Sequence, residues 1–419
     1  MAILLCSIGA NCGESLSDET NAAFRDELKE WKKLTDKIGI WSYVTNFENY
    51  MTPFPNLKIF AGDMKFLSEN NVISVLAQGD WNGGGVTGDF VALRAWLFSK
   101  LMWDPKQDPE KLLRSFTDGY YGVKAAPFIR KYWELLSDEA AKNKAYVGCF
   151  TGNTAKWLSL DTLLKAYDLM EQAIKSAEKD NWLIRERILI AAQPIRIAAL
   201  ERANSIRVKY PDLKIDFHAL YNTIRRVADR NNGYKYQENR GAEALYAILK
   251  KNTLPPPPRN PAKPSARVKN KAKYFILQAQ DISTAPSRYS SIVDDPDASD
   301  GKAIRFVDKV YTWTPQYHPN LDGFPMQPGK YRLYLTIRAE AADGKTGEGI
   351  AFEAGSYDLV KKIISDTQIP FSKIAEKYTE IDMGVHDLNQ NCYLYFAPKK
   401  NLSVKYVYVD RLVIIPVKD

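Results

Sequence analysis

Short apolar runs alternate with amphipathic stretches over the first 150 residues of the chain. The strand-like runs occupy residues 3–8, 38–44, 57–60 and 72–76. Between the first two, Phe24, Leu28, Trp31 and Leu34 recur at the spacing of one helix face. Short buried strands that alternate with helices are typical of a parallel sheet. The pattern therefore predicts a β/α arrangement with about four strands.

Four strands are too few for a closed (β/α)₈ barrel, which has eight strands and roughly 250 residues. An open doubly wound sheet needs fewer strands, but a phosphate-binding glycine turn is missing. Gly83–Gly85 and Gly88 fit neither the GxGxxG nor the GxxxxGK[ST] spacing. We therefore interpret residues 1–150 as a partial β/α barrel, and we expect a flexible loop at these glycines rather than a nucleotide site.

The rest of the chain predicts two further regions. A helix pattern over residues 90–101 has Asp89 in the N-cap position. Residues 151–253 read as a helical bundle in which Pro194 breaks a helix. A proline-rich linker follows at 254–270. Beyond it, residues 271–419 change to short alternating strands, which predicts an antiparallel β-sandwich of jelly-roll type.

Composition and charge limit the kinds of ligand and location that we expect. The net charge is +8, but the 58 basic and 50 acidic residues are mostly interspersed, so we expect no nucleic acid as ligand. The three histidines are far apart and no CxxC occurs, so we expect neither a zinc site nor a cofactor. Residues 3–8 lack a preceding basic residue, which favours a buried strand over a signal peptide. No apolar run reaches the ~18 residues of a membrane span.

Several motifs in the first 140 residues are distinctive in combination. They are Ile40–Tyr50, Pro53–Asn56, Gln78–Gly79, Gly88–Trp96, Leu101–Pro105 and Gly119–Gly122. Together they resemble a bacterial family of uncharacterised proteins related to glycoside hydrolases, which is likened to α-glucuronidases and β-hexosaminidases. The resemblance implies the C-terminal half of a catalytic barrel, a complex polysaccharide as ligand and a periplasmic or extracellular location.

One departure from that family bears on catalysis. Related sequences often carry Glu directly before the Gln-Gly pair, whereas this chain has Ala77 there. In the last region, Val407–Ile414 and Gly329–Tyr334 resemble strands of galactose-binding-like sandwiches, a similarity of fold that does not establish function.

Barrel active sites lie at the carboxyl ends of the strands. Asp80 follows a predicted buried strand, so it is our candidate catalytic carboxylate, although a turn role before the glycines explains it equally simply. Tyr43, Asn46, Gln78 and Trp81 are candidate sugar contacts, because aromatic faces stack on pyranoses and amides bind hydroxyl groups. Core packing or structural hydrogen bonds are the alternatives for each.

In the predicted sandwich, Trp313 and Tyr317 fall in one loop near Tyr311 and His318 and are a candidate sugar platform, with rim packing as the alternative. The acidic turn of Asp294, Asp295, Asp297 and Asp300 lacks the order of an EF-hand, so we expect no metal there.

Three functions remain open from the sequence. The first is a glycoside-hydrolase-related protein that binds or processes complex polysaccharide, with catalysis dependent on a complete active site. The second is a non-catalytic carbohydrate-binding module. The third is a structural or assembly protein, in which a partner chain or an N-terminal half-barrel covers the open edge of the sheet.

Overall fold

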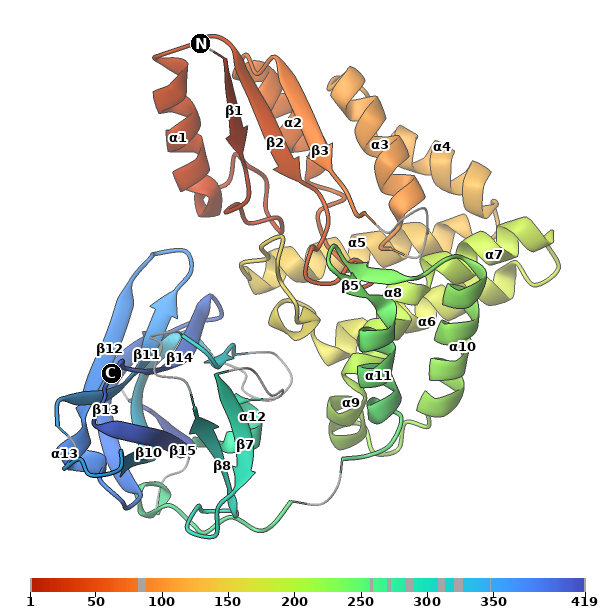
Figure 1. Cartoon of the computed structure of the whole chain (residues 1–419). Helices are drawn as coiled ribbons and strands as arrows, with labels where there is room; N and C mark the ends of the chain where they lie inside the picture. Colours follow the sequence, from red (N-terminus) through yellow and green to blue (C-terminus); the bar gives the residue numbers. More distant parts are fainter. Residues whose placement is uncertain are drawn as a thin grey trace. The chain divides into compact units, whose positions relative to one another are not determined.

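The computed structural model describes residues 2–81, 88–256, 259–269, 273–283, 289–307, 313–319, 327–346 and 348–417. The chain divides into two compact units, residues 1–256 (unit 1) and 257–419 (unit 2). Each has its own hydrophobic core, and Figure 1 shows their elements.

Unit 1 begins with a three-stranded parallel sheet in the order β1 (Ile3–Cys6), β2 (Ile38–Tyr43), β3 (Ser74–Gln78). Sequential parallel strands need crossover segments, and α1 (Ala22–Lys32) and α2 (Phe60–Glu69) lie within the two crossovers. The described part of unit 1 thus contains the predicted β/α arrangement, while closure into a barrel stays a prediction.

The two faces of this sheet differ. Leu5 and Ile40 point into the core that also holds Phe24 of α1 and Met64 of α2. Neighbours along each strand point the other way, and there Leu4 is 53% and Leu76 49% exposed. The helices therefore cover one face, and the described residues leave much of the other uncovered.

The remaining elements of unit 1 are mostly helical. They are α3 (Val91–Trp103), α4 (Pro109–Tyr121), α5 (Ala126–Asn143), η1 (Glu19–Asn21), η2 (Thr154–Lys156), α6 (Leu160–Ser176), α7 (Trp182–Ala191), α8 (Gln193–Glu201), α9 (Ala203–Lys209), α10 (Phe217–Arg230), a hairpin of β4 (Lys235–Gln237) and β5 (Arg240–Gly241), and α11 (Ala242–Asn252). The predicted break at Pro194 is confirmed, because α7 ends at Ala191 and Pro194 lies in the first turn of α8.

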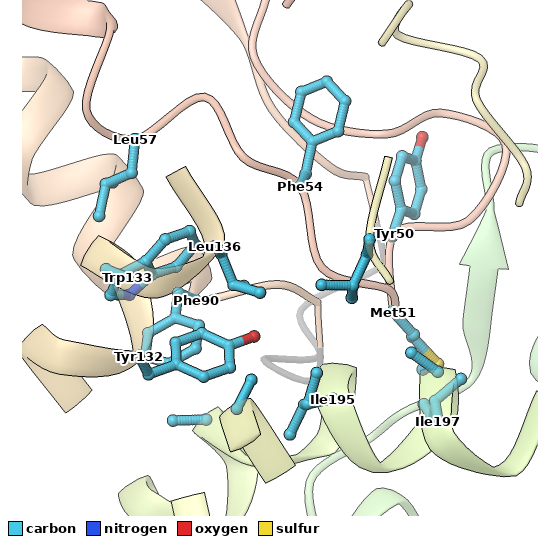
Figure 2. Close-up of a cluster of buried hydrophobic side chains, with 14 of the residues drawn as sticks. Tyr50, Met51, Phe54, Leu57, Phe90, Tyr132, Trp133, Leu136, Ile195 and Ile197 are labelled. Atoms are coloured by element: carbon cyan, nitrogen blue, oxygen red, sulfur yellow. The ribbon is translucent and has the colours of Figure 1, made fainter. Parts of the chain in front are cut away.

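The helices share one core with the segment that follows β2. Figure 2 shows Met51 of that segment beside Ile197 of α8, and Tyr50, Phe54, Tyr132 and Ile195 belong to the same cluster. The sheet and the helical region, which the sequence predicts as separate domains, accordingly form a single unit.

Two local predictions in unit 1 are wrong. Residues 57–60 form a turn that leads into α2 rather than a fourth strand, because Leu57 and Phe60 are buried by packing against helices. Asp89 does not cap α3; Phe90, with φ 51°, occupies the N-cap position without a side-chain bond. The Asp89 carboxylate instead pairs with Arg94 and accepts a hydrogen bond from the backbone of Phe54.

Unit 2 consists of two antiparallel sheets. The larger has the order β13-β10-β15-β8-β7, with β6 also paired to β15, and the smaller has the order β12-β11-β14-β9. The strands are β6 (Phe275–Gln278), β7 (Ser290–Asp294), β8 (Lys302–Phe306), β9 (Gln316–Tyr317), β10 (Gly329–Ala341), β11 (Ile350–Asp358), β12 (Ile364–Pro370), β13 (Thr379–Leu388), β14 (Cys392–Pro398) and β15 (Val404–Pro416), with η3 (Ala266–Val268), α12 (Ala279–Ile282) and α13 (Phe371–Ile374) between them.

The core of unit 2 lies between its two sheets. Leu333, Leu335 and Ile337 of β10 join Phe352 of β11 and Phe396 of β14 in one buried cluster. The alternation predicted along β10 is therefore confirmed for its inward residues. Antiparallel strands in two sheets are observed, whereas a jelly-roll connection stays a prediction.

Candidate functional site

The carboxyl ends of β1, β2 and β3 bring several predicted contact residues together. Trp41 and Tyr43 lie two apart on β2, so their side chains share a face of the sheet, and their rings stack with centroids 6.3 Å apart at 12°. Gln78 lies opposite Tyr43 in register and accepts a 2.7 Å hydrogen bond from Trp41 Nε1. In the described part of the chain, its amide nitrogen makes no further bond. This edge thus presents flat aromatic rings beside an amide donor.

Aromatic side chains continue beyond the strand ends. Tyr43 makes an edge contact with Phe47, whose ring centroid is 5.8 Å from that of Phe150. Phe150 is 56% and Trp81 is 60% exposed. Lys235 Nζ lies 3.6 Å from the centroid of the Trp81 ring, which is cation–π distance. Phe150 and Trp81 thus both leave part of their ring surface exposed.

Asn46 has a structural role here. It is buried, and Nδ2 donates to the Thr151 carbonyl at 2.8 Å and to Thr52 Oγ1 at 3.3 Å. Its Oδ1 accepts a bond from the backbone of Glu48. With both ends of the amide occupied, Asn46 holds the β2 segment against the 148–152 loop instead of presenting its amide to a ligand.

Asp80 lies beside a different set of residues. It lines a cavity of about 340 Å³ together with Ala77 of β3 and with Arg94 and Phe98 of α3. Burial raises its pKa to about 6, and the nearby Asp89 acts in the same direction, whereas Arg94 opposes it. Ala77 and Leu76 alternate along β3, so this cavity is on the helix side of the sheet and not on the Trp41–Tyr43 face.

The structure adds two residues that the sequence did not single out. Glu48, five residues after β2, is half-buried, and Gln237 Nε2 donates to its Oε2 at 3.2 Å. Burial raises the pKa of Glu48, while Arg240 opposes that rise. Because residues 48 and 237 are 189 positions apart, no local pattern could have paired them.

The candidate platform in unit 2 is divided between two sides of one sheet. Trp313 stacks on Tyr395 of β14 with centroids 4.3 Å apart at 16° and also contacts Tyr357 and Tyr393. Tyr317, in contrast, pairs with Leu394 and belongs to the inner core. Trp313 therefore lies on the outer face, and Tyr317 is placed as a core residue. Tyr311 lies outside the described residues.

The outer face around Trp313 also carries buried polar groups. Tyr395 donates its hydroxyl to Glu353 Oε1 at 3.2 Å, and Lys399 pairs with Glu353 at 2.5 Å. In the acidic turn, Asp295 accepts bonds from Arg338 and Tyr378. Protein donors thus occupy one of the two buried carboxylates of that turn.

Comparison with known proteins matches residues 1–134 to a family described as a domain of unknown function, DUF4838. The match runs from β1 into α5 and contains the Trp41–Tyr43 edge. No curated protein matches the chain. Among the described residues, no helix has both the length and the apolar character that a membrane span requires.

Solved structures with local similarity include carbohydrate-active proteins. One is the GH26-CBM35 β-(1,4)-mannanase of Podospora anserina, with 12% identity over 35% of this chain and TM-score 0.20; the match spans only 28% of that enzyme. The binding module TmCBM61, solved with β-1,4-galactotriose, has 9% identity, 38% coverage of this chain, 100% of its own and TM-score 0.21. A family 35 binding module of Clostridium thermocellum has 17% identity, 35% coverage, 100% of its own and TM-score 0.18. Similarity at this level carries no information on the ligand of this chain.

Proposed function

We propose that this chain is a glycoside-hydrolase-related protein that binds complex polysaccharide at the carboxyl edge of its parallel sheet. The observation that carries the proposal is the stacked Trp41–Tyr43 pair with Gln78, which is followed three residues later by the exposed Trp81. Pyranose rings offer apolar C–H patches to aromatic faces and hydroxyl groups to amides. Parallel sheets bind ligands at this edge because the loops that follow the strands converge there.

Hydrolysis is a separate step beyond binding. Glycoside hydrolysis uses two carboxyl groups that flank the scissile bond. Asp80, with its pKa raised to about 6, has the protonation behaviour of a general acid, but its cavity lies on the helix side of the sheet. The ring-stacking surface and the candidate acid therefore belong to different faces. We accordingly propose that unit 1 binds the glycan and that hydrolysis requires an active site completed by further residues.

The uncovered face of the sheet favours the proposal that a further structural element packs on it. Parallel strands occur almost only where both faces are buried. Leu4 and Leu76 are exposed, and β1 carries no charged residue that would discourage pairing at its edge. We propose that further β/α units, from an adjoining segment or from a partner chain, cover this face in the functional protein. In that setting the chain supplies part of a barrel.

Unit 2 provides an alternative location for the same ligand class. Trp313, stacked over Tyr395 on the outer face of the smaller sheet, is the observation that favours it. In this second proposal the sandwich is a carbohydrate-binding module and unit 1 has no contact with sugar. A periplasmic or extracellular location suits both proposals and can be checked by fractionation of expressing cells.

The test measures binding of the whole chain to a panel of soluble oligosaccharides by isothermal titration calorimetry. The panel contains xylohexaose, mannohexaose, β-1,4-galactotriose and a glucuronic-acid-capped xylotetraose. Trp81→Ala should weaken binding by about 1–3 kcal/mol, which is the contribution of one stacking ring at an interface. Trp103→Ala is the matched control, because Trp103 is 89% exposed at the end of α3.

The outcomes distinguish a glycan site in unit 1 from a glycan site in unit 2. Loss of binding in Trp81→Ala with unchanged binding in Trp103→Ala supports unit 1. Loss only in Trp313→Ala moves the site to unit 2. If the unaltered chain binds no member of the panel, the proposal of a glycan-binding protein is wrong for these sugars.

A further inference from the structure

The β4–β5 hairpin is part of unit 1 but lies more than 150 residues after the parallel sheet in the sequence. It is fastened to the segment that follows β2, because Tyr50 N donates to the Tyr236 carbonyl at 2.8 Å. Lys235 of β4 contacts Trp81, and Gln237 of β4 contacts Glu48. The hairpin thus meets both the segment after β2 and the segment after β3.

Glu48 is held in a defined position on its own segment. Its backbone N–H donates to Asn46 Oδ1 at 3.1 Å, and Phe47 N donates to the Cys149 carbonyl at 2.7 Å. A Cβ on Gly152 would lie 2.8 Å from Glu48 Cγ, so only glycine lets the side chain pass. The carboxyl group is therefore oriented by three separate segments of unit 1.

A half-buried carboxylate in this place is costly for a purely structural role. Burial disfavours its charged form, which is why its pKa is raised. Arg240 is the nearby charged group that counters this, but its side chain is exposed and interacts with the hydroxyl of Tyr236. A neutral amide would accept the same bond from Gln237 at lower cost. Carboxylates that are kept charged against such a cost are enriched at functional sites.

We infer that Glu48 and Gln237 form a hydroxyl-binding pair in the unit 1 glycan site, and that β4 is one wall of that site. In this arrangement one sugar hydroxyl donates to the Glu48 carboxylate and a second donates to the Gln237 carbonyl oxygen. Lys235 of the same strand contacts the ring of Trp81. The inference rests on the proposed function and narrows the ligand to a neutral pyranose with vicinal hydroxyl groups.

The charge of Glu48 sets the expected selectivity. A uronic acid placed at this position would bring its carboxylate close to that of Glu48, and like charges within a few ångströms disfavour binding. Neutral xylohexaose or mannohexaose should therefore bind more tightly than the glucuronic-acid-capped xylotetraose. Glu48→Gln should reduce that preference, because it removes the charge and keeps the shape.

The experiment compares Glu48→Gln and Gln237→Ala with the unaltered full-length chain, using the oligosaccharide panel above and calorimetric binding. Glu48→Gln should bind the neutral oligosaccharides about tenfold more weakly, since a charge-assisted hydrogen bond is replaced by a neutral one. Gln237→Ala should weaken binding by roughly threefold or more. Gly152→Ala, which displaces Glu48 without removing it, should act in the same direction.

Glu186→Gln is the matched control. Glu186, on α7, also accepts a side-chain amide bond, from Asn231 at 2.7 Å, and additionally pairs with Arg230 at 2.9 Å, but it lies outside the candidate site. Melting temperatures of all variants show whether a loss of binding reflects unfolding. If Glu48→Gln misfolds, the binding affinities of Gln237→Ala and Gly152→Ala test the inference instead.

The outcomes separate this inference from the proposed function. Unchanged affinity in folded Glu48→Gln, together with lost affinity in Trp81→Ala, overturns the role of Glu48 and leaves the glycan site standing. Equal weakening in Glu186→Gln shows a general effect of removing a buried charge and also overturns it. If the unaltered chain binds none of the oligosaccharides, both the pair and the proposed function fail.

Discussion

The parallel sheet of unit 1 and the paired sheets of unit 2 differ in how completely their strand residues are buried. All seven residues of β14 are buried, because one sheet packs on its inner face and aromatic side chains cover its outer face. β3 has no buried residue at all. Leu76 of β3 is apolar and yet half exposed, so at this position the difference lies in what covers the strand. The two sheets of unit 2 bury their facing sides against each other, whereas the described residues leave one face of the unit 1 sheet largely exposed.

The largest effect should come from breaking the ion pair that anchors the carboxyl edge of unit 1. Arg94 is buried and pairs with Asp89, and its guanidinium also donates to the carbonyl of Phe54 at 2.6 Å. Arg94→Ala leaves a buried carboxylate without its partner, which costs about 3–5 kcal/mol. Hydrogen exchange followed by mass spectrometry should show faster exchange through unit 1 and unchanged exchange in unit 2. Equal loss of protection in both units would show that their stabilities are coupled, contrary to this expectation.

A matched pair of leucines tests the comparison between the sheets directly. Leu335 in β10 is fully buried between the sheets of unit 2, whereas Leu76 in β3 is half exposed. Leu335→Ala should destabilise unit 2 by about 2–5 kcal/mol through the cavity that it leaves. Leu76→Ala should change stability by less than about 0.5 kcal/mol if the face is uncovered in solution. Urea denaturation measures both variants, and region-specific hydrogen exchange assigns each loss to its unit.

A large cost for Leu76→Ala would be informative in the opposite sense. It would mean that another copy or another segment already covers this face in solution. Sedimentation velocity distinguishes the two, because only association between copies changes with protein concentration.

The sequence predicted strands and helices best where their period was regular. β1, β2, β3 and β10 follow apolar runs or clean alternation, and the break at Pro194 follows from its missing N–H and fixed φ. Residues 57–60 failed because a short apolar run does not distinguish a strand from a turn that is buried by neighbouring helices. The union of sheet and helices into one unit depends on tertiary contacts such as the hydrogen bond from Asn49 to Glu201 at the end of α8, which leave no local signal.

The candidate site was predicted in part and for the same reason. Position after a strand placed Tyr43, Gln78 and Trp81 near one edge, because parallel strands end together. It could not show that Asp80 lines a cavity on the helix side or that both ends of the Asn46 amide are occupied. Glu48 was missed because its partner, Gln237, belongs to a hairpin that is distant in the sequence.

A further expected effect concerns pH, to which the two units should respond in opposite directions. In unit 1, burial raises the pKa of Glu201 to about 8, and Asn49 donates to its carboxyl at 3.2 Å. An acid with a raised pKa in the folded state stabilises folding below its unfolded pKa of 4.5 and loses that contribution as pH rises towards 8. In unit 2, burial lowers the pKa of His386, so its contribution is present above pH 6.5 and is lost as pH falls.

Glu201→Gln should therefore stabilise unit 1 by roughly 1–3 kcal/mol at pH 8 and leave it unchanged at pH 4, because the amide keeps the bond from Asn49 without the buried charge. His386→Asn should flatten the acid response of unit 2 and have no effect on the pH response of unit 1. Urea denaturation at pH 4 and pH 8, with exchange measured region by region, follows both. A gain for Glu201→Gln that is equal at both pH values would contradict titration of Glu201 as its source, since only the ionised carboxylate carries the desolvation cost.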